Sequence, residues 1–282
     1  MSISLLANTT SLNAQNNLRI SQGSLEKSLE RLSSGQRINR ASDDAAGLGI
    51  SENLKADIRS LAQAQRNAND GISMTQVAEG AMNEMQGIVG RMRELAVQAA
   101  NGTLGSDERG YIATEFTQLV SEINRISNVT EFNGTKLLDG TASGGLTMQI
   151  GIHDSADDRL SLSIATLTAS TLGNTASGAF ISGQSLSSAS GAQAALAVFD
   201  SAIQSLSNSR AKVGAVQSRM TIAVSNLSTA QSNLSEANSR IRDVDVAAET
   251  ANMTRYQILT QAGVAVLGQA NQLPALALKL LG

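Results

Sequence analysis

Apolar residues recur every seven positions through the last third of the chain, from Val213 to Ala248. A second apolar residue follows each of them three positions later, which is the a/d heptad of helices that pack in coiled coils. One helix alone would leave this stripe as a long apolar seam in water. We therefore expect the segment to lie against another long helix. The stripe comprises Val213, Val216, Met220, Ala223, Leu227, Ala230, Leu234, Ala237, Ile241, Val244, Ala248 and Ala251.

A looser stripe with the same period runs from Leu54 to Ala99. Asp57 and Thr75 are polar intrusions, and Gly71 weakens a helix by about 1 kcal/mol relative to alanine. Two seams of similar length near the two ends of the chain predict an antiparallel pair of long helices and an elongated molecule. We expect the core of this rod to contain Leu54, Leu61, Met82, Val89, Val213, Val216, Met220, Leu227, Leu234, Ile241 and Val244.

Composition supports thin helix–helix seams rather than a compact core. Aromatic residues make up only 2% of the 282 residues, and tryptophan is absent. The one proline, Pro274, should kink or break the last helix. A net charge of −3 without a basic patch disfavours nucleic-acid binding. The absence of cysteine excludes disulfides, thiolate metal sites and cysteine nucleophiles.

The first ten residues lack the basic and apolar regions of a secretory signal peptide, and no apolar run approaches the ~20 residues of a membrane span. These features predict a cytoplasmic protein or one exported without a cleaved signal.

Helical patterns fill both ends of the chain and a short β-region lies between them. We expect a helix over residues 1–35, a second one N-capped by Ser42 and a third from Ser106 to about Asn128. The period then changes to two around 146–152 and 160–164, which predicts a small β-hairpin. Residues 165–191 are rich in serine, glycine, alanine and threonine, so we expect a surface or flexible segment that buries little.

The predicted fold class is mainly α, an elongated antiparallel bundle of long helices with a small β-hairpin region. The expected parts are an inner terminal helix with its linker (1–41), the N-terminal part of the rod with the hairpin (42–165), a short variable surface segment (166–191), the C-terminal part of the rod (192–246) and an inner C-terminal helix (247–282).

The sequence offers no constellation for catalysis, cofactor or metal. His153 is the only histidine and stands in a loop rich in glycine and aspartate, where a solvated role is expected. A calcium-binding loop formed by Asp154, Asp157 and Asp158 is an alternative. Their spacing differs from that of an EF-hand, so a solvated acidic turn is preferred. No nucleophile stands with a base, and we expect a protein that is not an enzyme.

Several short motifs, in order over both ends of the chain, resemble bacterial flagellin. They are SLNAQNNL at 11–18, LERLSSG at 29–35, RIN at 37–39, DDAAG at 43–47, RELAVQ at 93–98, FNG at 132–134, GAVQSR at 214–219, SRI at 239–241, QAG at 261–263 and QANQ at 269–272.

The resemblance implies a structural subunit that self-assembles into the helical filament of the bacterial flagellum, outside the cell. It implies termini that pair as an inner coiled coil, a short form without large outer domains, and export through the flagellar type III channel. Implied partners are further copies of the chain, the flagellar junction and cap proteins, and an export chaperone at the C-terminal helix. A hook–filament junction protein with similar terminal helices stays open as the alternative.

The resemblance also implies a surface patch for Toll-like receptor 5, formed by Arg91, Leu95 and Glu115. Next to this patch the chain departs from the family pattern, because receptor-activating flagellins commonly have a polar residue at the position of Gly90.

Overall fold

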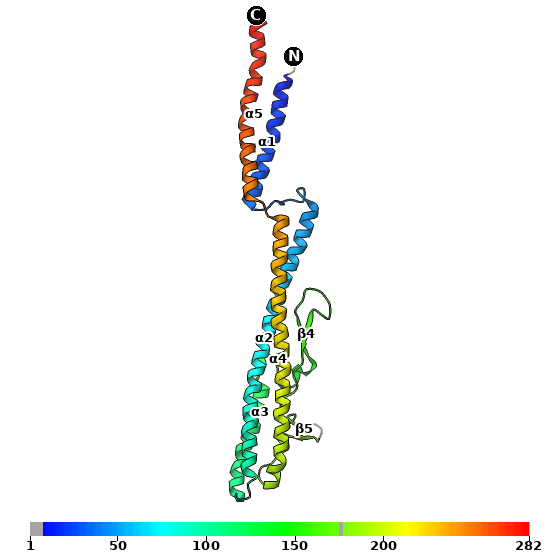
Figure 1. Ribbon diagram of the computed structural model, residues 1–282, viewed down its shortest axis with the longest axis vertical. Helices are drawn as coiled ribbons and strands as arrows, with labels where there is room; N and C mark the ends of the chain where they lie inside the picture. Colours follow the sequence, from blue (N-terminus) through cyan, green and yellow to red (C-terminus); the bar gives the residue numbers. More distant parts are fainter. Residues whose placement is uncertain (1–7, 175–176, 282) are drawn as a thin grey trace. The chain divides into compact units, whose positions relative to one another are not determined.

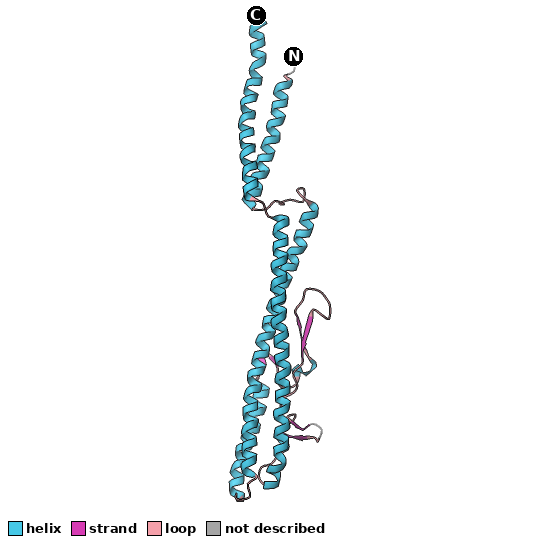
Figure 2. Cartoon of the chain, viewed as in Figure 1, coloured by secondary structure: helices cyan, strands magenta, loops and turns pink. Residues whose placement is uncertain are grey.

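The computed structural model describes the backbone of residues 8–174 and 177–281, with side chains described up to residue 272. Helices dominate the described part, and a small β-region follows the third of them (Figures 1 and 2). This confirms the predicted helical bundle with a short β-region. The helices are α1 (Thr9–Ser34), α2 (Ala45–Ala99), α3 (Ser106–Val129), α4 (Ala189–Arg242) and α5 (Val246–Leu281).

The chain divides into two compact units, and α2 and α4 contribute residues to both. The first unit contains residues 1–58 and 232–282, and the second contains residues 59–231. The sequence had placed the corresponding boundaries at 41/42 and 246/247. The expected start of the first helix, residues 1–7, lies outside the described residues, and the described helix α1 begins at Thr9.

Helices α2, α3 and α4 surround the core of the second unit (Figure 1). From Leu61 to Ala99 the a/d positions of α2 are all buried, because the heptad period keeps one face of the helix turned toward its neighbours. The Phe116 ring of α3 meets the Phe199 ring of α4 with centroids 5.8 Å apart. Aromatic packing therefore joins α3 to α4.

Gly71 lets three elements meet closely. A Cβ atom at this position would lie 2.8 Å from the Met220 sulfur of α4 and would also clash with the Met148 sulfur. The glycine thus costs helix propensity but leaves room for two methionine side chains against the backbone of α2.

The β-region consists of three two-stranded antiparallel sheets among the described residues. In the first, Asn133 and Gly134 both have positive φ, as a two-residue type I′ hairpin turn requires. The predicted hairpin forms with Leu146 opposite Leu162. The strands are β1 (Glu131–Phe132), β2 (Thr135–Lys136), β3 (Leu146–Gln149), β4 (Arg159–Leu162), β5 (Gly173–Asn174) and β6 (Ala179–Phe180), with 3-10 turns at Thr141–Gly144 and Ile181–Gly183.

The expectation that residues 165–191 bury little is wrong. Leu167, Leu172, Ile181 and Leu186 are at most 2% exposed and belong to the core of the second unit. These four large apolar residues stand among many small ones, so the composition of the segment did not indicate that they are buried. They stand five to nine residues apart, and each covers part of the helix bundle from a loop or short turn.

In the first unit, α1 ends at Gly35, whose φ of 70° gives the left-handed cap that glycine favours. The prediction that Ser42 caps the next helix is wrong. Asp44 takes that role, because its Oδ1 accepts a hydrogen bond from the Gly47 backbone N–H at 2.8 Å.

The heptad stripe is divided between two helices, close to the boundary at 246/247 that was expected between the rod and the inner C-terminal helix. Helix α4 ends at Arg242, and Asp245 caps a new helix by accepting from the backbone N–H groups of Ala247 and Ala248. Beyond this break Ala248 and Ala251 are exposed. Helix α5 then runs to Leu281 without the break expected at Pro274.

Candidate functional site

In the described part of the chain, no group of three His, Cys, Asp or Glu side chains could hold a metal ion. None of the described helices is both long and apolar enough to cross a bilayer. The features that stand out are the packing of the helices and the apolar side chains that they leave exposed.

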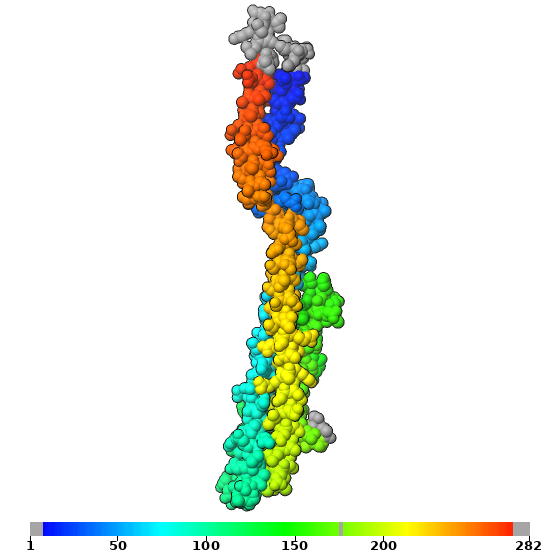
Figure 3. Space-filling model, viewed as in Figure 1, coloured from blue at the N-terminus to red at the C-terminus, as the bar shows by residue number. Residues whose placement is uncertain are grey.

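The buried and half-buried side chains of helices α1 and α5 include small and polar residues and also Leu18, Leu25, Leu32, Met253 and Leu267. The Cα atoms of the two helices come within 8 Å of one another along the pair, and the two helices lie in contact in the space-filling view (Figure 3). Gly263 permits one such approach, since a Cβ there would stand 3.2 Å from Leu18 Cδ1. The described residues buried on these two helices are Ser11, Ala14, Ser28, Glu249 and Ala270.

Large apolar side chains of the same helices remain in water. An ordinary pair of amphipathic helices buries them in its seam, whereas here they are 47–61% exposed. A groove of about 230 Å³ between the helices adds the apolar atoms of Leu18, Ala262 and Gly263. Extended apolar surface of this kind marks an interaction site. The exposed residues are Leu12, Ile20 and Leu29 on α1, and Val246, Ile258, Leu259, Val264 and Val266 on α5.

Two connecting segments join at the base of the α1–α5 pair. Gln36 forms an isolated antiparallel bridge with Asp243. The Arg37 backbone N–H donates to the Arg242 carbonyl at 2.6 Å, and the Arg37 guanidinium donates to the Ile241 carbonyl at 2.7 Å. The segment after α1 and the segment before α5 thus support each other.

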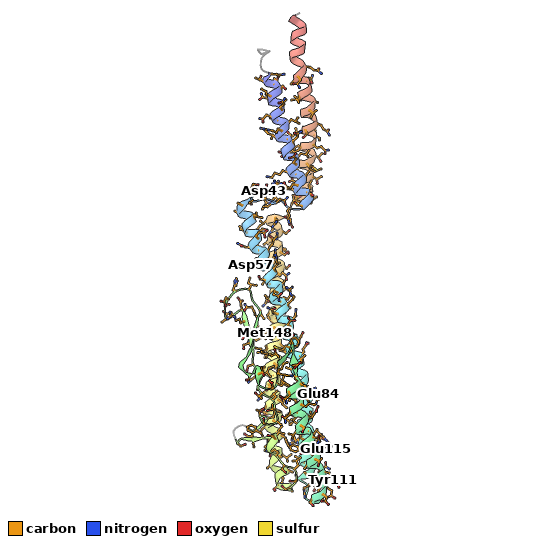
Figure 4. All side chains as sticks on the ribbon, turned by 180° about the vertical axis from the view of Figure 1, so that it is seen from behind. Asp43, Asp57, Glu84, Tyr111, Glu115 and Met148 are labelled. Carbon is orange, nitrogen blue, oxygen red and sulfur yellow. The ribbon has the colours of Figure 1, made fainter. Side chains whose placement is uncertain are left out.

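Asp43 ties the first of these segments back to α1 (Figure 4). Its carboxylate lies 2.7 Å from Lys27 Nζ and accepts from the backbone N–H groups of Arg40 and Asn39. The hydrogen bond from Lys27, followed by that from Arg40, lowers the pKa of Asp43 from 3.8 to about 2.

Replacing Asp43 with asparagine should remove a pH-dependent part of the stability. A lowered folded-state pKa means that the carboxylate stabilises the fold fully above about pH 4, and that this contribution is lost as the pH falls through about 2. The thermal midpoint of the wild type should exceed that of Asp43→Asn near pH 5, and the gap should close toward pH 2. Circular dichroism melts would measure it, and a gap independent of pH would contradict this assignment.

The structure places the expected rod-core residues at two levels of burial. Leu61, Met82, Val89, Val213 and Met220 are buried. The others are half-buried, and they lie toward the ends of the stripes: Leu54, Val216, Leu227, Leu234, Ile241 and Val244.

Only two of the three residues of the expected receptor patch lie on the surface. Leu95 is 1% exposed and packs in the core, so it cannot belong to a contact surface in this structure. Arg91 pairs with Glu115 at 2.9 Å and with Glu94 at 3.1 Å, and the pairing with Glu115, then Glu94, raises the pKa of Arg91. Glu115 projects from α3 near Tyr111 (Figure 4).

Comparison with known proteins identifies the family. The bacterial flagellin N-terminal helical region matches residues 5–143, and the bacterial flagellin C-terminal helical region matches residues 196–281. The chain belongs to the bacterial flagellin family. It is 43% identical to a flagellin of Halalkalibacterium halodurans, over 97% of this chain and 98% of that one. It is 41% identical to the flagellar filament 30.7 kDa core protein of Treponema maltophilum, over 94% of each chain.

A solved structure shares the fold at low identity. A Vibrio parahaemolyticus protein described as flagellar hook-associated covers 71% of this chain and all of its own, with a TM-score of 0.59 and 16% identity. At this identity the likeness concerns the fold alone. The family and its filament-forming relatives make this flagellin a structural protein of the flagellar filament, not an enzyme, and do not favour the junction-protein alternative.

Sequence reasoning pointed to the terminal helices for self-association but did not identify which of their apolar side chains stay exposed. Spacing alone does not say whether a residue such as Leu12 faces its own chain or another copy. The polar residues inside the pair, above all Ser28 and Glu249, carried no separate signal.

Proposed function

We propose that the chain polymerises through the outward apolar faces of α1 and α5. The observation that supports this is a contrast within the pair: its fully buried side chains are small or polar, whereas several of its large apolar side chains are exposed. Each exposed leucine, isoleucine or valine would contribute about 1.5 kcal/mol or more when buried against a neighbouring copy. The contacts must join different surfaces, head to tail, so that growth does not close on itself.

Hydrogen exchange of monomer and filament tests this proposal. Assembly should raise the protection of amides in α1 and α5 at least about tenfold, because neighbouring copies suppress their local opening. Amides of α2 between Met82 and Ala96, already inside the monomer core, serve as the internal control. Equal protection of α1 and α5 in both states would remove the terminal helices from the polymer contact.

We propose that the remaining partners of the flagellum use the same exposed faces before and after assembly. An export chaperone would cover the apolar residues of α5 and so prevent polymerisation inside the cell. Junction and cap proteins would meet the helices left uncovered at the two filament ends. Export would proceed through the flagellar type III channel without cleavage of a signal peptide, and an intact N-terminus in secreted protein, measured by mass spectrometry, would support it.

We also propose contact with Toll-like receptor 5, now reduced to the surface pair Arg91 and Glu115. Both side chains are about half-exposed and face the same surface through their ion pair. Reversing the charge with Arg91→Glu should reduce the response of receptor reporter cells to monomer by about tenfold or more, because a single interface arginine often dominates binding. No response to wild-type monomer at high dose would end this proposal.

A further inference from the structure

A polar cluster lies inside the α1–α5 pair where coiled coils usually place apolar residues. Ser28 Oγ of α1 donates to Glu249 Oε1 of α5 at 2.5 Å, and this hydrogen bond is buried. Arg31 Nη1, one turn from Ser28, lies 3.7 Å from Glu249 Oε2 and is the only cation paired with this carboxylate in the described part of the chain. Ser28 is 3% and Glu249 8% exposed.

We infer that Glu249, held by Ser28 and Arg31, is the residue that fixes the register of α1 against α5. A carboxylate is almost never buried without a partner, and a buried polar group at one seam position is a known means of setting helix register. The inference rests on the proposed function, since the register decides which apolar residues of the two helices stand side by side for a neighbouring copy. Glu249 is a positioning residue and makes no contact with another copy.

Among the described residues, Glu249 is the only charged side chain that is buried on α1 or α5. The half-buried residues of the two helices include Leu18, Leu25, Leu32, Met253 and Leu267, which carry no charge. Sliding α5 by one turn, about 5.4 Å, toward the beginning of α1 would move Glu249 from Ser28 to Ser24. At that position Ser24 and Lys27 repeat the spacing of Ser28 and Arg31, but Lys27 is already paired with the Asp43 carboxylate at 2.7 Å, so Glu249 would have to compete with Asp43 for this cation.

Contacts at the far end of the pair agree with the observed register. Ser11 Oγ donates to Asn271 Oδ1 at 2.7 Å, and Asn8 Nδ2 donates to the Ala270 carbonyl at 3.0 Å. These groups are uncharged and less buried than the Ser28–Glu249 hydrogen bond. They support the observed register together with the buried Ser28–Glu249 hydrogen bond and its Arg31 partner.

Disulfide trapping can read the register directly, because the chain contains no cysteine. A Cβ at position 263 lies 3.7 Å from Leu18 Cβ, within the ~3.5–4.5 Å that a disulfide requires. Leu18→Cys/Gly263→Cys therefore reports the observed register. Ala14→Cys/Gly263→Cys reports a slip of one turn, since Ala14 precedes Leu18 by one turn.

The decisive variant replaces Ser28 and Glu249 together, so that no buried carboxylate is left without its hydrogen-bond partner. Ser28→Ala/Glu249→Leu should keep the helix content, since an apolar pair can replace a buried polar one at little cost. The slipped cross-link should rise about tenfold, because a preference of only 1.4 kcal/mol between registers has that effect, and filament yield from seeds should fall. Ser33→Ala/Glu26→Leu makes the same replacements at exposed positions of α1 and should change neither readout.

Each result decides the inference. If the double variant loses helix content, Arg31→Gln replaces it, and this change alone should increase the slipped cross-link. Unchanged cross-linking in a folded variant would overturn the role of Glu249 while leaving the proposed polymerisation intact. Failure of the wild type to extend seeds would instead contradict the proposed function.

Discussion

Deletion of residues 247–282 should abolish polymerisation. The deletion removes α5 except Val246, and with it Ile258, Leu259, Val264 and Val266, which are half of the exposed large apolar side chains described on the α1–α5 pair. The second unit, residues 59–231, has its own core and should remain folded. Sedimentation and electron microscopy should find only monomer, with the thermal transition of the second unit preserved. Filaments from the truncated chain would contradict the role given to α5.

Single substitutions sharpen this test. Ile258→Glu and Val264→Glu each place a charge where a neighbouring copy would bury an apolar side chain, and an unpaired buried charge costs several kcal/mol. Each should raise the concentration needed for assembly more than a hundredfold. Gln261→Glu introduces the same charge at an exposed polar position between them and serves as the control. Equal loss of assembly in all three variants would point to net charge rather than to the apolar face.

Phe199→Ala should cause the largest loss of stability among single core substitutions. The side chain is fully buried and packs against the Phe116 ring at 5.8 Å. Truncation of a buried phenylalanine to alanine costs about 3–5 kcal/mol through lost burial and the cavity left behind. At ~2–4 °C per kcal/mol for a unit of this size, the thermal midpoint should fall by roughly 6–20 °C.

The matched control for this change is Tyr111→Ala. Tyr111 is an aromatic residue of α3 that is 77% exposed, so its removal should change the free energy of unfolding by no more than about 0.5 kcal/mol. Comparable losses in the two variants would show that the Phe116–Phe199 contact is not the centre of the core.

The sequence allowed the long helices to be predicted because their burial follows a period. From Leu61 to Ala99 one stripe specifies one buried face, and no distant residue has to be known. The same reasoning failed at Ala248 and Ala251, since the stripe continues across a break that Asp245 creates by capping a new helix. Counting apolar residues every seven positions does not reveal three non-helical residues between two helices when the apolar spacing continues across them.

Other features depended on contacts that the sequence does not encode locally. Leu167, Leu172, Ile181 and Leu186 are buried one at a time from loops, which gives no period to detect. The resemblance implies a surface role for Leu95, but the orientation of α2 places its side chain in the core. The sequence did not distinguish the exposed apolar residues of the α1–α5 pair from the half-buried ones, because apolar spacing is the same whether a seam faces its own chain or the next copy.

Seeded growth tests the central claim most directly. Purified chain is added to short filament fragments of the same protein, and the lengths are measured by electron microscopy over time. The account predicts long filaments that extend from the seeds in proportion to the protein added. Seeds that stay the same length, or that gain only a short terminal addition, would contradict it and would favour a junction protein.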